Sequence, residues 1–374
     1  MHPNNELTGL PPIKVVGVGG GGCNAVNRMI EQKINGVHFL AINTDAQQLA
    51  DSEAGERMRI GDKLTRGLGV GGDAEIGKMA AEESRADLME TLKGMDMVLI
   101  TAGMGGGTGT GAAPIVAEVS HEIGALTIAI VTKPFAFEGA KRRQVAAAGL
   151  ERLTEHADTV IAVPNDRLLA LAGPNTTVSE AFRLADDVLR HGIAGISDVI
   201  TVPGEINLDF NDVKKVMGAG GRALMATGCG SGENRAVDAA QMAITSPLLE
   251  IDVTGARKVL YNVISAGDLG LNELNMAAKV IQEMVDPEAE IIFGTAIDPS
   301  LDGDVQITVI ATGFDKPLPL PVAEDGERWS SEMLSEMGLD AEDVELPAFL
   351  RRQRTYAVSS SHAAGEATPP FQSF

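Results

Sequence analysis

Two glycine-rich segments are the strongest candidates for chemistry in this chain. They read GVGGGGCN at residues 17–24 and AGMGGGTGTG at residues 102–111, and each lies where a strand-like run gives way to a helix-like one. Without side chains, successive glycines let backbone N–H groups approach an anion closely, and a following helix adds unpaired N–H groups and a positive dipole end. The pair therefore predicts a cradle for a nucleotide that carries several phosphates.

Short apolar runs and amphipathic helices alternate around these segments. We expect strands at residues 13–18, 37–45, 97–103, 126–134 and 158–166, with helices at 24–32 and after Gly111. Runs rich in Val and Ile between helices predict an α/β fold, a doubly wound and mostly parallel sheet covered on both faces. The glycine-rich segments then follow the carboxyl ends of strands, where open α/β sheets bind ligands.

The second half of the chain has a different pattern of predicted helices and strands. Residues 179–200 have apolar positions at helical spacing and predict a long helix that joins two halves. Beyond it, strands expected at 221–230, 257–267, 289–297 and 304–314, with helices near 236–244 and 274–284, predict a smaller α+β domain. The predicted organisation is a flexible N-terminus at 1–12, a nucleotide-binding domain at 13–178, a central helix at 179–202 and an α+β domain at 203–315.

The composition changes after Lys316. Residues 317–345 carry nine acidic side chains and one basic, so we expect a disordered acidic linker over 316–345. The sequence LPAFLRRQR at 346–354 is a short apolar and basic island, typical of a segment that folds onto a partner's groove, although a chance cluster is an alternative. Residues 355–374 form an extra tail.

Bulk composition excludes several classes of protein. The net charge of −22 argues against binding to nucleic acid and would repel an anionic membrane. Two cysteines, Cys23 and Cys229, provide no disulfide framework and suit a reducing compartment. The start lacks a signal-peptide pattern, and the uncharged run at 97–117 is interrupted by glycines and Pro114, so we expect a cytoplasmic protein without direct membrane insertion.

A dinucleotide-dependent oxidoreductase is the alternative from the first segment alone. GVGGGG satisfies G-x-G-x-x-G, and Asp45 follows the next strand at roughly the offset of a ribose-binding residue. An ordinary dinucleotide fold has no need for a second glycine-rich loop, and the six histidines are scattered. Neither segment has the Gly-Lys-Ser/Thr ending of a P-loop. A nucleotide-binding scaffold without hydrolysis is a third possibility.

Further motifs give the chain a resemblance to a known family. NTDAQ at 43–47, GLGVGGD at 67–73, KPFAFEGAKR at 133–142, PNDRLL at 164–169 and NLDFNDV at 207–213 resemble, together with the glycine-rich segments, the FtsZ family of the tubulin superfamily. The likeness extends from about Ile13 to Phe314, and GGGTGTG is its most specific string. It implies a GTPase that binds GTP or GDP, with Mg²⁺ bound mainly through the nucleotide. It also implies head-to-tail filaments that act in bacterial cell division at midcell.

The resemblance assigns roles residue by residue. Phosphates would be held by Gly20, Gly21, Gly22, Cys23 and Asn24 in the first segment and by Gly103, Gly105, Gly106, Gly107, Thr108, Gly109 and Thr110 in the second. Asn43, Thr44, Asp45, Gly71 and Gly72 would lie near the γ-phosphate and its Mg²⁺, Glu138 and Arg142 at ribose and phosphate, and Asn165, Phe182 and Asp186 at the base. A carboxylate accepts from guanine N1–H and its amine, which favours GTP over ATP, and Asp187 is the alternative to Asp186.

Other residues in this set also have plain structural interpretations. Asp45 could cap a turn. Glu138 and Arg142, at i and i+4, could simply pair on a helix surface. Cys23 is either a small residue that fits a turn or a thiol whose pKa is lowered at a helix N-terminus.

The cradle contains no evident residue that would orient the attacking water. The resemblance implies that the next subunit supplies Asn207, Asp209 and Asp212, and that the carboxylates of the two aspartates position and polarise water. Asp209 and Asp212 are also spaced like an N-cap and its third helical residue, and both roles can coexist. Repeated head-to-tail contacts build filaments, so hydrolysis would depend on assembly. The island at 346–354 would recruit membrane-anchoring and regulatory division proteins, although the extra tail leaves its accessibility open.

Overall fold

The computed structural model describes residues 10–169, 176–202, 204–206, 208–218, 220–246, 253 and 255–314. These residues belong to one compact unit within residues 1–323. Asn207, the linker at 316–345, the island at 346–354 and the tail at 355–374 lie outside the described residues, as does most of the segment at 1–12. The domain boundaries given above stay predictions.

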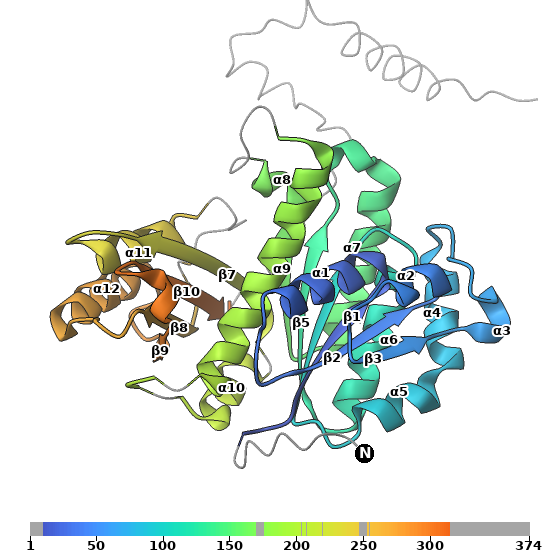
Figure 1. Cartoon of the computed structure of the whole chain (residues 1–374), viewed down its shortest axis with the longest axis horizontal. Helices are drawn as coiled ribbons and strands as arrows, with labels where there is room; N and C mark the ends of the chain where they lie inside the picture. Colours follow the sequence, from blue (N-terminus) through green and yellow to red (C-terminus); the bar gives the residue numbers. More distant parts are fainter. Residues whose placement is uncertain are drawn as a thin grey trace, which may run out of the picture. The chain divides into compact units, whose positions relative to one another are not determined.

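Within the described residues, ten strands form one sheet in the order β3-β2-β1-β4-β5-β6-β7-β10-β8-β9 (Figure 1). Their bounds are β1 (Ile13–Val18), β2 (His38–Asn43), β3 (Glu56–Arg59), β4 (Met97–Gly103), β5 (Leu126–Lys133), β6 (Thr159–Pro164), β7 (Gly221–Gly230), β8 (Lys258–Ser265), β9 (Glu290–Ile297) and β10 (Val305–Thr312). Every pairing from β3 through β7 is parallel, and β10 runs antiparallel to both β7 and β8. The predicted α/β fold with a mostly parallel sheet is confirmed.

Helices cover the sheet and connect its strands. They are α1 (Gly19–Glu31), α2 (Ala46–Ala50), α3 (Asp62–Thr65), α4 (Ala74–Glu83), α5 (Arg85–Leu92), α6 (Thr108–Glu122), α7 (Ala140–His156), α8 (Asn165–Leu168), α9 (Val178–Thr201), α10 (Phe210–Met217), α11 (Arg235–Ile244) and α12 (Leu271–Met284), with 3₁₀ turns η1 (Ala136–Glu138) and η2 (Pro299–Leu301). No described helix is long and apolar enough to cross a bilayer.

The starts predicted for the two helices after the glycine-rich segments were wrong. α1 begins at Gly19 rather than at Asn24, and α6 begins at Thr108 rather than after Gly111. Glycine is a poor helix former, so its runs indicate a loop. Here the first turn of α6 is helical and needs glycine for another reason, because it lies against a neighbouring strand: a Cβ on Gly109 would lie 2.8 Å from the carbonyl oxygen of Gly103.

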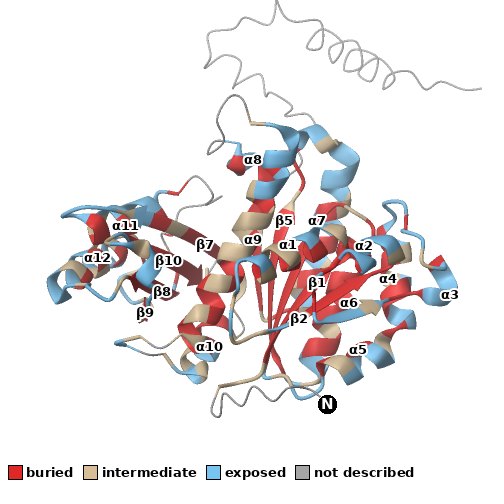
Figure 2. Cartoon of the chain, in the orientation of Figure 1, coloured by how far each residue is buried: buried red, intermediate tan, exposed pale blue. Residues whose placement is uncertain are grey.

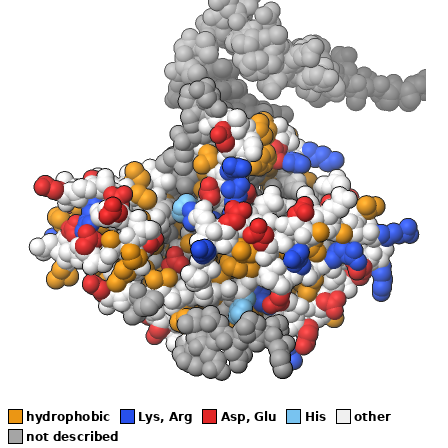
Figure 3. Space-filling model, viewed as in Figure 1, with side chains coloured by type: hydrophobic (Ala, Val, Ile, Leu, Met, Phe, Trp, Pro, Cys, Tyr) orange, Lys and Arg blue, Asp and Glu red, His pale blue; other side chains and the backbone are white. Residues whose placement is uncertain are grey.

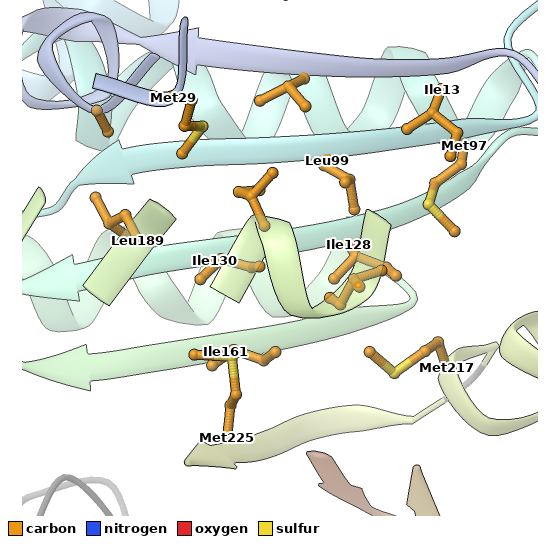
Figure 4. Close-up of a cluster of buried hydrophobic side chains, with 14 of the residues drawn as sticks. Ile13, Met29, Met97, Leu99, Ile128, Ile130, Ile161, Leu189, Met217 and Met225 are labelled. Atoms are coloured by element: carbon orange, nitrogen blue, oxygen red, sulfur yellow. The ribbon is translucent and has the colours of Figure 1, made fainter. Parts of the chain in front are cut away.

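The sheet is buried on both faces, as the red strands between helices in Figure 2 show. On one face Met29 of α1 and Leu189 of α9 belong to a buried cluster with Leu99 and Ile130 of the sheet (Figure 4). On the other face α4 to α7 enclose a second cluster, and α11 and α12 cover the strands β7 to β10 with a third. The rigid sheet therefore holds the ends of its strands in place.

The long helix predicted over residues 179–200 is α9. It has 24 residues and is therefore about 36 Å long. Figure 1 shows α8 near one end of this helix and α10 near the other. The hydroxyl of Thr159, at the amino end of β6, donates to the carbonyl of Met217 in α10 at 2.5 Å. α10 therefore lies at the edge of the sheet opposite to the carboxyl ends of its parallel strands.

Candidate nucleotide site

The segments at the carboxyl ends of five adjacent parallel strands carry most of the residues predicted for the nucleotide cradle. The strands are β2, β1, β4, β5 and β6 in that order. The two glycine-rich segments are neighbours because β1 and β4 are paired, with Val18 opposite Ala102. The sheet thus brings residues from distant parts of the sequence to one edge.

The helices that follow β1 and β4 begin without a cap. Val18 and Gly107 stand at the N-cap positions of α1 and α6, neither supplies a side-chain hydrogen bond, and neither first turn contains an acidic residue. In contrast, α2 and α4 near the same edge are capped by Asp45 and Asp73. The first N–H groups of α1 and α6 are therefore free of side-chain caps, and with the helix dipoles they form an anion-binding surface.

The two glycine-rich segments touch through their backbones. A Cβ on Gly19 would lie 2.7 Å from the amide nitrogen of Gly109, and one on Gly21 would lie 3.3 Å from that of Gly103. Gly106 has no heavy atom within 4 Å of such a Cβ, so its backbone borders open space. Gly21 and Asn24 are exposed at this surface, whereas Gly22 is buried beneath it. The segments thus combine close packing with an open anion-facing side.

Cys23 lies at this surface only through its backbone. Its side chain is 2% exposed, and the thiol points at the carbonyl oxygen of Ile42, at 3.7 Å. Burial raises the pKa of Cys23 to about 12. The lowered pKa considered from the sequence is wrong, because the side chain turns from the helix N-terminus into the core.

The segment after β2 contacts the second glycine-rich segment. The hydroxyls of Thr44 and Thr108 are 2.8 Å apart, and both side chains are buried. Asn43 Oδ1 accepts from the backbone N–H of Thr44 at 2.9 Å. Asp45 accepts from the N–H of Gln47 at 2.9 Å, so its capping role is confirmed. Asn43, Thr44 and Asp45 are therefore held beside the cradle by local bonds.

A glycine turn before α4 packs against the second segment. Gly71 and Gly72 are exposed and have φ of +61° and +86°, a conformation that side chains disfavour. A Cβ on Gly107 would meet Val70 and would lie 3.0 Å from the N–H nitrogen of Asp73. Within the second segment, Thr110 accepts from the N–H of Gly105 at 2.8 Å. This turn therefore borders the cradle next to Gly107.

Three phenylalanines form an aromatic group beyond β5. Phe182 of α9 meets Phe135 edge to face with ring centroids 5.4 Å apart, and its centroid is 6.5 Å from that of Phe137. Phe182 is 42% exposed and can offer a stacking face. Phe135 and Phe137 were not predicted as site residues, although their i, i+2 spacing in KPFAFEG was visible.

Glu138 and Arg142 form the ion pair that their spacing allows. Glu138 also accepts from the N–H of Phe135 at 2.9 Å, so it orders the turn at η1. The structural interpretation of this pair is confirmed, while a role toward a ligand stays a prediction. Arg142 is the more exposed of the two and keeps N–H groups free to approach a phosphate.

Asn165 follows β6 directly and carries an orphaned polar atom. The residue is only 4% exposed, and its Oδ1 has no hydrogen-bond partner among the described residues. Buried polar atoms are nearly always paired, so an unpaired one at this edge offers an acceptor to a ligand or a water. The residues present therefore fit a nucleotide.

Asp186 and Asp187 differ in their surroundings. Asp186 Oδ2 accepts from Arg28 Nε of α1 at 3.0 Å, and its side chain is 14% exposed. Burial raises the pKa of Asp186 to about 6, against the opposing effect of Arg28. Asp187 is 35% exposed and lies 3.8 Å from Arg190. No sequence pattern pointed to Arg28 as the partner of Asp186.

The acidic segment before α10 lies at the opposite edge. Asp209 Oδ1 accepts from the N–H of Asp212 at 2.9 Å, and Asp212 Oδ2 accepts from the N–H of Asp209 at 3.3 Å. This reciprocal capping confirms the structural role predicted from their spacing. β6 alone, with 6 residues, spans about 20 Å between the two edges. These carboxylates are therefore remote from the cradle of their own chain.

Charge is unevenly distributed along the chain. Residues 221–314 hold 13 acidic and 5 basic side chains, so this part contributes more than its share of the net charge. On the face drawn in Figure 3, Lys and Arg are more frequent over α1 to α3 than over α11 and α12. Among the described residues, no group of three or more His, Cys, Asp or Glu could hold a metal ion. The cradle thus lies in the less acidic part.

Comparison with protein families gives two matches. Residues 12–173 match the Tubulin/FtsZ family, GTPase domain, and residues 221–315 match the FtsZ family, C-terminal domain. The two matches together cover most of the described residues and fall on either side of α9.

Solved structures give the same result. An empty FtsZ dimer from M. jannaschii is 46% identical, with a TM-score of 0.78 over 81% of this chain and 88% of that chain. A mutant of FtsZ from M. jannaschii is 45% identical, with a TM-score of 0.79 over 82% of this chain and 92% of that chain. CetZ2 from Haloferax volcanii, a GTPγS-bound protofilament, is 20% identical and shares the fold, with a TM-score of 0.70 over 94% and 99% of the two chains.

Proposed function

Since the chain belongs to the Tubulin/FtsZ family of GTPases and filament-forming proteins, we propose that it hydrolyses GTP at the contact between consecutive subunits. The observation that carries the proposal is the meeting of two uncapped helix N-termini, α1 and α6, at the carboxyl ends of paired strands. Such a surface suits the phosphates of a nucleotide. The acidic segment at the other edge of the sheet then completes the site of a neighbouring copy.

The roles of the cradle residues follow their chemistry. Backbone N–H groups of the glycine-rich segments, with the Thr108 hydroxyl, hold the phosphates. Phe182 stacks on the base, the orphaned Oδ1 of Asn165 accepts a donor from the nucleoside, and Asp186 accepts from guanine. Glu138 and Arg142 contact ribose and phosphate. Asn43, Thr44, Asp45, Gly71 and Gly72 would lie near a Mg²⁺ held mainly through the nucleotide, which would supply positive charge against the phosphates.

Hydrolysis requires a water aligned with the γ-phosphate. We assign Asp209 and Asp212 of one subunit, with Asn207, to orient and polarise that water at the cradle of the next subunit. The separation of about 20 Å between α10 and the cradle supports this, because neither carboxylate can reach its own chain's nucleotide. A contact of this head-to-tail kind repeats without closing and therefore builds filaments.

The cellular role follows from the family. We propose that the filaments assemble in the cytoplasm at the division site at midcell and form the ring of bacterial cell division. Because the described helices include no membrane span, attachment would come through partners, membrane-anchoring and regulatory division proteins that bind residues 346–354. Hydrolysis would loosen the contacts and drive filament turnover.

The test follows light scattering and phosphate release after GTP and Mg²⁺ are added to the purified chain. We expect reversible assembly, and turnover per subunit that rises sharply above a threshold protein concentration. Turnover that is proportional to protein concentration from zero, or NADH binding in place of GTP binding, would overturn the proposal. GTP-driven assembly without phosphate release would instead indicate a nucleotide-binding scaffold that does not hydrolyse GTP.

A further inference from the structure

Arg28 and Asp186 form a contact that none of the assigned roles uses. Arg28 lies in the last turn of α1, and Asp186 lies 158 residues later, two turns into α9. The guanidinium Nε donates to Asp186 Oδ2 at 3.0 Å. Among the described residues this is the one hydrogen bond to that carboxylate, so Oδ1 is left without a partner.

The electrostatics of this carboxylate depend on few groups. α9 packs on α1, β5, α8 and β9. From these elements, Arg28 of α1 is the charge that favours the ionised form of Asp186, and Asp187 of α9 is the one that disfavours it. Burial also disfavours ionisation and is the largest influence, so the pKa lies near 6 even with the arginine present. Without Arg28, burial and Asp187 act unopposed.

We propose that Arg28 is a positioning residue for base discrimination, which keeps Asp186 ionised and leaves its Oδ1 free to face the base. The inference rests on the proposed function, because it assigns Asp186 to guanine. A carboxylate is acceptor-only and matches the N1–H and amine donors of guanine, whereas a protonated carboxyl presents an O–H that opposes them. Since a carboxylate has about four lone-pair sites, guanine can bind while the bond to Arg28 persists.

The consequence is a defined pH dependence. The carboxyl must be ionised to accept from guanine, so GTP affinity falls as the pH drops through about 6. Replacing the arginine raises that pKa further, and the loss of affinity then begins at higher pH. A shift of about two units would leave about a tenth of the carboxyl groups ionised at pH 7, and GTP would bind roughly tenfold more weakly there.

The experiment measures GTP affinity of the full chain by calorimetry between about pH 5.5 and about pH 8.5. The variants are Arg28→Gln, Arg28→Lys, Asp186→Asn and, as a matched control, Arg85→Gln, which removes an ion pair between α5 and Glu118 of α6. We expect the midpoint of the affinity loss to rise by one unit or more in R28Q, to return most of the way in R28K, and to stay unchanged in R85Q. In D186N, weak binding should be independent of pH.

Three results are distinguishable. A profile of R28Q that has the wild-type midpoint, whether or not affinity drops overall, means that Arg28 only joins α1 to α9 and overturns the inference. If R28Q does not fold, the wild-type protein and D186N still provide a test. GTP affinity of the wild type that is as independent of pH as that of D186N would also overturn the inference. Wild-type protein that binds no GTP at any pH instead refutes the proposed function itself.

Discussion

Replacing Asp212 by alanine separates catalysis from folding and from nucleotide binding. Among the described residues, Asp212 accepts one hydrogen bond, from the N–H of Asp209 at 3.3 Å. The stronger half of the capping pair, from the N–H of residue 212 to Asp209 Oδ1 at 2.9 Å, involves the backbone of residue 212 and survives the substitution. The segment is solvent-accessible, so the free energy of unfolding should fall by only about 0.5 to 1.5 kcal/mol.

The expected effect on turnover is far larger. A residue that positions or deprotonates the attacking water contributes about 10² to 10⁴ in rate, or roughly 3 to 5 kcal/mol of activation free energy. GTP affinity should stay within about twofold of wild type, because the substituted residue is remote from its own cradle. Assembly should persist, since GTP is still bound.

The assay compares phosphate release at matched light-scattering amplitude, with Asp238→Ala as control. Asp238 is an exposed carboxylate in the first turn of α11, so its removal reproduces the change in charge and in helix-dipole interaction. A mixture of D212A with the cradle variant Gly109→Ala should recover part of the turnover, because intact segments then meet intact cradles across some contacts. Undiminished turnover in D212A, or no recovery in the mixture, would refute the shared site.

Three further predictions concern stability and the tail. Gly111→Ala puts a Cβ 2.5 Å from the N–H nitrogen of Lys78 in α4, so urea unfolding should show a loss of about 1 to 3 kcal/mol, whereas Gly106→Ala, with open space around it, should change stability by less than about 0.5 kcal/mol. Burial and the nearby Asp298 raise the pKa of Asp198 to about 6, so the cost of its charge is present above pH 6 and disappears as the pH falls to about 4. Asp198→Asn should therefore increase the free energy of unfolding by roughly 1 to 3 kcal/mol at pH 8 and by almost nothing at pH 4. Deleting residues 346–354 should leave GTP-dependent scattering intact and abolish co-sedimentation of a membrane-anchoring division protein; unaltered co-sedimentation would contradict the assignment.

Local patterns predicted most of the fold because they act over few residues. The observed bounds of β1, β4, β5 and β7 lie within one residue of those expected from the sequence. Strands that are buried on both faces have apolar side chains at successive positions, so their ends are easy to recognise. The capping pair of Asp209 and Asp212 was also visible, because N-cap and third helical position are neighbours in the chain. The edge strand β3 was missed, because its sequence ERMR carries no apolar run.

Contacts between distant segments could not be predicted in the same way. The sequence pattern of α9 shows which face of the helix is apolar. Which residues lie next to its polar face depends on how α9 crosses α1, so the contact between Arg28 and Asp186 could not be predicted from the sequence. The glycine-rich segments were assigned as loops because glycine's low helix propensity is a local property. In the structure the first turns of α1 and α6 need glycine because they approach β1 and β4 closely, which is a contact between distant segments and not a local property.

The two edges of the sheet are unlike in a way that gives a filament its polarity. At one edge, the N-termini of α1 and α6 lack side-chain caps, so they gain stability from an anion. At the other edge, Asp209 and Asp212 form a reciprocal capping box at the start of α10. This box holds the two carboxylates in a fixed orientation before any ligand or partner binds. An anion-binding surface and an ordered acidic one cannot pair with copies of themselves without leaving charge uncompensated, but in the proposed contact they would meet around a nucleotide and Mg²⁺. Subunits joined through these two unlike edges, as the proposed function requires, would all point the same way, so the filament would be polar.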